Sequence, residues 1–192
     1  MKYKILSLLI IVALISLGAC QKKKEPEKKE AQKKVAAGYV INFKPNDSLD
    51  LVPPKTIILQ PAGRAEVENT FNLTVVAKGV DKLFQVSFDL TFDPAFMSYQ
   101  DFKPGELFEQ KGKAEYKIGI KGDQKGKLGV KISLGPGETV SGSGKVVGLS
   151  FKGLQPGRGD ILFENGELID GQKKKIAETN WVGGLLWILE TS

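Results

Sequence analysis

The sequence predicts an all-β protein, a β-sandwich or jelly roll of about nine strands. Residues 84–94 alternate apolar and polar side chains, which is typical of a half-buried strand because successive side chains point to opposite faces of a sheet. Apolar runs separated by turn residues recur at intervals of roughly eight to twelve residues, and no long amphipathic helix interrupts them. The 22 glycines and the 41% hydrophobic content also fit a turn-rich globular protein.

The segment 84–94 is the expected central strand. Its apolar face carries Phe84, Val86, Phe88, Leu90 and Phe92. Its polar face carries Gln85, Ser87, Asp89 and Thr91. Three phenylalanines on one face bury a large apolar area, so a second layer must cover them. Asp93-Pro94 ends this strand, because proline cannot donate a ladder hydrogen bond.

The other expected strands follow from the same alternation and from turn residues. Residues 56–60 and 68–78 precede the central strand, and Asp81-Lys82 forms the turn into it. Residues 96–102 continue as a strand or helical turn, and a further helical turn is possible in 107–113. A hairpin joins 116–120 to 128–134 across a glycine-bounded loop, and 146–152 forms another strand.

Two predictions concern the end of the chain. Asn165-Gly166 is a strong hairpin signal, so residues 161–163 are expected to pair with 168–169. Residues 185–189 read Leu-Leu-Trp-Ile-Leu and are apolar on both faces, which favours a strand inside a sheet over one at its edge.

The first twenty residues form a secretory signal. Two lysines precede an apolar run at 5–17, which is shorter than the ~20 residues that a spanning helix needs. Its end, Leu-Gly-Ala-Cys at 17–20, resembles the lipobox of bacterial lipoproteins. That resemblance implies acylation of Cys20, which becomes the mature N-terminus. An ordinary signal peptide with an incidental cysteine is the alternative.

The chain divides into three parts: the signal peptide at 1–20, a linker at 21–54 and the sandwich domain at 55–192. Residues 21–34 are dominated by lysine and glutamate and cannot bury enough apolar surface to order, so we expect a disordered spacer. Contact of its lysines with anionic lipid is a second interpretation, which the interspersed glutamates weaken. Residues 39–43 could add a short strand before the domain.

Composition excludes several functions. Nine of the 28 basic residues lie in residues 1–34 with only three acidic ones, and the remainder of the chain is balanced at 19 of each. The domain therefore has no basic excess with which to bind nucleic acid. The absence of histidine and the single cysteine remove the usual zinc sites and the serine-histidine and cysteine-histidine catalytic pairs. We expect no enzyme activity, cofactor or metal; Asp89 and Asp93 are the only acid-base candidates and have no evident pocket.

Three blocks resemble the cohesin domain family. The run Leu-Phe-Gln-Val-Ser-Phe-Asp-Leu-Thr-Phe-Asp-Pro-Ala-Phe at 83–96 precedes Lys-Pro-Gly-Glu-Leu at 103–107. The second block is the glycine-rich strand entry at 140–146 with the strand that follows at 149–151, and the third is the closing strand at 184–188. The resemblance covers about residues 56–189 and implies a nine-stranded jelly-roll sandwich. It also implies a non-catalytic function, the binding of a dockerin module on a flat sheet face.

The resemblance also selects candidate partner-binding residues. The family's outward Asn-x-Asp pair falls on Gln85 and Ser87, which keeps hydrogen-bonding groups but drops the carboxylate. Asp89 lies next on the same face. Facing positions are Lys131 and Ser133, with Glu138 in the loop beyond. Ordinary solvation of a sheet surface is the alternative for this set.

Other functions remain open. A carbohydrate-binding module for polysaccharide attachment fits the same architecture, and Trp181 is the one aromatic that could serve as a sugar platform; its alternative role is to cap an end of the sandwich. A structural role in an envelope assembly is a third possibility. Gln21 after the cysteine favours the outer membrane or the cell surface, by resemblance to enterobacterial sorting.

Overall fold

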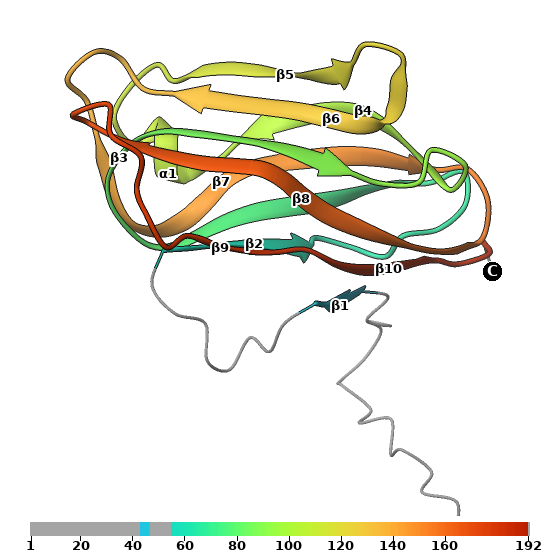
Figure 1. Ribbon diagram of the computed structural model, residues 1–192. Coiled ribbons are helices and arrows are strands. Elements are labelled where there is room, and N and C mark those ends of the chain that lie inside the picture. The colour runs from blue at the N-terminus through green and yellow to red at the C-terminus, as the bar shows by residue number, and fades with distance from the viewer. Residues whose placement is uncertain (1–42, 47–54, 192) are drawn as a thin grey trace, which may run out of the picture. The chain divides into compact units, whose positions relative to one another are not determined.

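The computed structural model describes residues 43–46 and 55–191 (Figure 1). Cys20 and the spacer at 21–34 lie outside these residues, as do residues 39–42. The described strands are β1 (Phe43–Pro45), β2 (Thr56–Pro61), β3 (Thr70–Thr91), β4 (Met97–Pro104), β5 (Glu115–Lys121), β6 (Gln124–Ser133), β7 (Val140–Gly153), β8 (Gly157–Asp170), β9 (Asn180–Val182) and β10 (Gly184–Ile188). One short helix, α1 (Glu106–Glu109), follows β4. No helix within the described ranges has the length and apolar character needed to cross a membrane.

Strand pairing confirms the predicted β-sandwich. One layer has the order β1-β10-β8-β3-β6-β5, and all of its pairs are antiparallel. The other layer has the order β9-β2-β3-β7-β4, in which only the β2-β9 pair is parallel. Strand β10 lies between β1 and β8, as its apolar sequence predicts (Figure 1).

Strand β3 belongs to both layers. Its first part, Thr70–Leu83, pairs with β7 and also with β2, whereas its second part, Leu83–Thr91, pairs with β6 and β8. The register shifts between Ala77 and Val80 and again before Leu83, where Gly79 and Lys82 have positive φ angles of 61° and 49°. The predicted turn at Asp81-Lys82 is therefore a bulged crossing within one long strand.

The core lies between the two layers and confirms the predicted inner face of the central strand. Val86, Phe88, Leu90 and Phe92 are buried, and Phe92 packs edge-on against Phe151 of β7 with ring centroids 5.2 Å apart. Phe84 differs because the register shifts between Leu83 and Gln85. Leu83 takes the fully buried position, while Phe84 is only partly buried against the core.

The predicted hairpin across Asn165-Gly166 is wrong, because β8 runs straight through these residues. Ser87 pairs with Glu167 and Asp89 pairs with Glu164, so Asn165 and Gly166 together oppose the single residue Phe88 in a β-bulge. Phe163 and Leu168 are five positions apart and would face opposite sides of a regular strand. The extra residue restores the phase, so that both apolar side chains pack toward the core.

Two other local predictions agree with the structure. The hairpin between 116–120 and 128–134 is confirmed as β5 and β6, and the possible helical turn in 107–113 overlaps α1. Residues 43–45, which the sequence placed in the linker, form β1 on the edge of β10. Phe43 is buried there and belongs to the core cluster.

Candidate functional site

The outer face of β8, β3, β6 and β5 gathers most of the predicted partner-binding residues into cross-strand rows. Gln85 of β3 lies opposite Ser133 of β6, which lies opposite Glu115 of β5. The next row contains Ser87, Lys131 and Lys117, and the third contains Asp89, Gly129 and Gly119. We call the outward side of these three rows, together with the adjoining residues Glu164, Asn165 and Glu167 of β8, the recognition face.

Glu138 does not belong to these rows. It lies in the loop between β6 and β7, where its backbone N–H donates to the Gly135 carbonyl with N···O 3.1 Å. Its carboxylate lies over Gly135 of the same loop. The described structure therefore brings together Gln85, Ser87, Asp89, Lys131 and Ser133 and leaves Glu138 beyond them.

Asp89 is the electrostatic centre of the recognition face. Although its side chain is on the outer face, the residue is only 3% exposed. Lys121 of β5 lies 2.6 Å from Oδ1, and the Asn165 side-chain amide donates to Oδ2 at 2.7 Å. Lys127 lies 3.7 Å from Oδ2 and also pairs with Glu164 at 2.7 Å. Asp89 thus organises its neighbours and does not present an open carboxylate to a partner.

These contacts decide the ionisation of Asp89. Burial acts to raise the pKa of its carboxyl group, but the hydrogen bonds from Lys121 and Asn165 and the charges of Lys121 and Lys127 outweigh it, so this pKa lies below its ordinary value. Asp89 is accordingly charged at neutral pH, with two lysines to compensate it. The bond to Glu164 likewise raises the pKa of Lys127.

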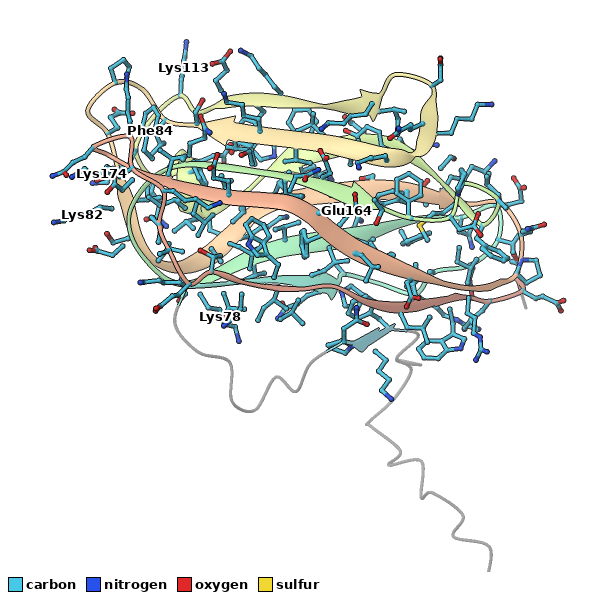
Figure 2. All side chains as sticks on the ribbon, in the orientation of Figure 1. Lys78, Lys82, Phe84, Lys113, Glu164 and Lys174 are labelled. Carbon is cyan, nitrogen blue, oxygen red and sulfur yellow. The ribbon has the colours of Figure 1, made fainter. Side chains whose placement is uncertain are left out.

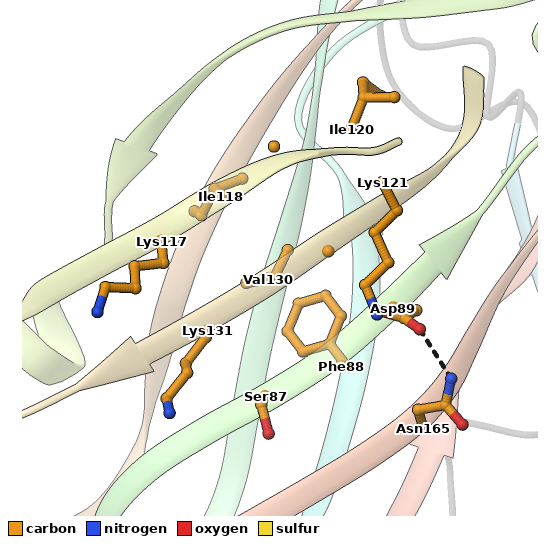
Figure 3. Close-up of a pocket in the computed structure, with 12 residues that line it drawn as sticks. Ser87, Phe88, Asp89, Lys117, Ile118, Ile120, Lys121, Val130, Lys131 and Asn165 are labelled. Atoms are coloured by element: carbon orange, nitrogen blue, oxygen red, sulfur yellow. Dashed lines mark hydrogen bonds and ion pairs between the residues drawn. The ribbon is translucent and has the colours of Figure 1, made fainter. Parts of the chain in front are cut away.

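A hollow of about 640 Å³ opens on the β5–β6 side of this centre (Figure 3). Gly119 and Gly129 lie opposite each other on β5 and β6 and contribute no side chain to it. Figure 3 shows Lys117, Lys121 and Lys131 around this region, with Asp89, Asn165 and Ser87 on the side of β3 and β8. The hollow can receive side chains of a binding partner in a face that is otherwise a flat sheet.

Trp181 does not form an open platform of the kind that a sugar ring would stack on. Its indole packs against Phe88 and Phe163, with ring centroids 5.8 and 5.4 Å apart. The backbone of Gly166 lies against the same ring, so closely that a Cβ there would be 2.3 Å from Cε2. This packing matches the alternative interpretation, in which Trp181 closes part of the sandwich.

Sequence reasoning missed Lys117, Lys121, Asn165 and the two glycines. Lys117 and Gly119 could have been found, because they alternate with the apolar residues of the predicted strand 116–120, and Lys121 continues the same alternation directly after it. Asn165 could not, because a hairpin turn would have taken it away from Asp89. Among the described residues, no group of three or more histidine, cysteine or acidic side chains could hold a metal ion.

Comparison with known families identifies the fold. The family model described as the cohesin domain matches residues 56–182. The chain belongs to the cohesin domain family. This confirms the resemblance inferred from the sequence blocks, and the match contains every strand of the recognition face. No curated protein matches the chain.

Solved cohesin structures share the architecture at low sequence identity. A non-cellulosomal cohesin from the archaeon Archaeoglobus fulgidus is 16% identical with a TM-score of 0.59, covering 73% of this chain and 93% of that one. A type II cohesin domain from the cellulosome of Acetivibrio cellulolyticus is 14% identical with a TM-score of 0.61, covering 71% and 95%. A mutant type II Cohesin-X-Dockerin complex from the same organism is 18% identical with a TM-score of 0.58, covering 71% and 99%. These likenesses establish the jelly-roll sandwich.

Proposed function

We propose that this protein is a lipid-anchored recognition module of the bacterial cell envelope, which binds a protein partner through the recognition face without catalysing a reaction. The observation that carries the proposal is the arrangement of Gln85, Ser87, Lys131 and Ser133 in two adjacent rows on an outward sheet surface. These side chains provide hydrogen-bonding groups over an extended strand backbone, which suits a protein surface better than a small molecule.

The family supports the choice of partner class. A type II cohesin from Acetivibrio cellulolyticus occurs in a complex with an X-dockerin module. By this analogy the partner is a dockerin-like module on another protein of the same cell. The position that carries the family's carboxylate holds Ser87 here, so we expect a partner whose contacts differ from those of classical dockerins.

The anchor supports the proposed location. Acylation at Cys20 would hold the domain at the membrane, and more than one acyl chain gives durable attachment. The lysine-rich and glutamate-rich spacer would then separate the recognition face from the lipid surface. We propose the outer membrane or the cell surface as the site of attachment.

The test is partner capture followed by titration. The chain is used to recover partners from the source cell with calcium present and absent, because dockerins fold around calcium. Ser87→Arg should then weaken binding of the recovered partner by about 2 kcal/mol, because a bulky charge must be desolvated at the centre of the interface. Stability should change by less than about 0.5 kcal/mol, since the substitution is on the outer face.

The control compares protein with carbohydrate. Wild type and Ser87→Arg are also titrated against a panel of soluble glycans. Normal binding of the recovered partner by Ser87→Arg would mean that the recognition face is wrongly placed. Glycan binding in the absence of any protein partner would replace the proposal with a carbohydrate-binding function.

A further inference from the structure

Gly119 and Gly129 lie at the bottom of the hollow on the recognition face. A Cβ at Gly119 would meet no heavy atom within 4 Å, so the space above β5 is open. A Cβ at Gly129 would meet only the side chain of Lys121, whose Cε would be 2.9 Å away. A side chain of a partner can therefore reach the sheet backbone above Gly119, whereas the side chain of Lys121 already lies over Gly129.

The charge around this hollow is positive. Lys117, Lys121 and Lys131 surround the hollow, and among the described residues Asp89 is the only one that contributes a carboxylate to its lining. The charge of Asp89 is already compensated by Lys121 at 2.6 Å and by Lys127 at 3.7 Å. Lys131 is exposed and has no ion-pair partner within 4.0 Å in the described part of the chain. Lys117 pairs with Glu115 at 2.9 Å, but both side chains are about two-thirds exposed, so this pair is weak.

The β8 side of the recognition face carries negatively charged side chains. Glu164 and Glu167 of β8 lie across β3 from the lysines, next to Asp89 and Ser87 respectively. Glu164 pairs with Lys127 at 2.7 Å but is half exposed, and Glu167 has only a long contact of 3.9 Å with Lys175. Apart from Glu115, which pairs with Lys117 at one end of β5, a partner that meets this face finds basic groups over β5 and β6 and acidic groups over β8. Such a pattern fixes the orientation in which the partner docks.

The geometry points to an acidic side chain of the protein partner as the group that enters the Gly119–Gly129 hollow, where Lys117 and Lys131 hold its carboxylate while Lys121 stays paired with Asp89. This inference rests on the proposed function, because it names the chemistry of the partner that the recognition face binds. It also accounts for the missing carboxylate at Ser87: the acidic group of this interface comes from the partner.

The test selects binders without assuming their charge. A library of random displayed peptides is screened against the full-length protein in detergent micelles, and the peptides that bind the recognition face are recognised by their loss of binding to Ser87→Trp, which adds bulk beside the hollow without adding charge. We expect these peptides to be enriched in aspartate or glutamate. The double variant Lys117→Glu/Lys131→Glu should bind these peptides about tenfold or more weakly, because it reverses the sign of the charge around the hollow. When the selection is repeated against that double variant, the peptides should be enriched in lysine and arginine instead of aspartate and glutamate.

Two further variants separate charge at the hollow from charge elsewhere. Lys82→Glu/Lys174→Glu makes the same change in net charge at two exposed positions outside the recognition face, Lys82 in the bulged part of β3 and Lys174 in the loop after β8 (Figure 2), and should leave binding unchanged. Gly119→Val fills the open space above β5 without changing the charge and should exclude the acidic side chain. Thermal melts of all variants verify that they are folded.

The outcomes distinguish the inference from the proposed function. Face-binding peptides that are neutral or basic, or that ignore reversal of Lys117 and Lys131, would overturn the acidic partner while leaving the recognition face in place. A selection in which no peptide responds to Ser87→Trp would overturn both.

Discussion

Gly166→Ala tests the packing that distinguishes a structural Trp181 from an exposed one. A Cβ added at Gly166 would lie 2.3 Å from Cε2 of Trp181 and 2.6 Å from Cδ2 and Cζ2. Ordinary carbon contacts begin near 3.5 Å, so the indole would have to move by about 1 Å. Phe88 and Phe163 lie on the same ring and Phe88 is 2% exposed, which leaves the indole little room to retreat.

The expected cost follows from this geometry. Inserting a methyl group into a packed site that cannot relax destabilises a protein by about 1–3 kcal/mol. The matched control is Gly119→Ala, whose Cβ meets no heavy atom within 4 Å and which should change stability by less than about 0.5 kcal/mol. Urea titration of wild type and both variants measures the two differences.

A double-mutant cycle tests whether the loss of stability in Gly166→Ala comes from the contact with Trp181. Trp181→Leu removes the ring atoms that the new methyl group would strike and keeps an apolar side chain at the position. In that background Gly166→Ala should be nearly neutral, so the coupling free energy should also be about 1–3 kcal/mol. If Gly166→Ala is harmless in wild type, or equally harmful in both backgrounds, the indole does not pack beneath the β8 bulge and a surface role for Trp181 becomes tenable again.

Three other changes test the core, the ionisation of the recognition face and the anchor. Phe88→Asp should leave the domain unfolded or aggregated, because an unpaired buried charge costs several kcal/mol against a total stability of ~5–15 kcal/mol; cooperative melting near the native temperature would contradict the assigned inner face. Because the pKa of Asp89 in the folded protein lies below its ordinary value of 3.8, the stabilisation by its carboxylate is present above that pH and is lost as the pH falls through the folded-state pKa. The free energy of unfolding of wild type should therefore exceed that of Asp89→Asn by about 1.5–3 kcal/mol at pH 7 and by progressively less below pH 4, as measured by urea titration. A difference in stability that persists at the most acid pH would contradict this pH dependence. Cys20→Ser should abolish acylation and cleavage at this site, and an unlipidated native N-terminus in mass spectrometry would refute the anchor.

The sequence by itself determined the layers of this fold. Alternation at Val86, Phe88 and Leu90 identified the inner face of the central strand, since burial of one sheet face requires a period of two. The same rule placed Ser87 and Lys131 on the outer face, and the structure pairs them across β3 and β6. Turn residues at 122–126 and the apolar run at 185–189 located the β5–β6 hairpin and an interior strand in the same way.

Only the tertiary structure decided which backbone conformation the turn residues Asn165 and Gly166 adopt. Asn165 takes a positive φ of 50°, a conformation that serves a hairpin turn as well as a bulge, so the dipeptide itself does not choose between them. The choice depends on β10 and β3, which pair with successive parts of β8 and hold it straight. The bulge then directs Asn165 onto Asp89 and opens the space at Gly166 that Trp181 fills. Contacts between residues some 75 positions apart cannot be read from a local pattern, because they exist only once the strands are paired.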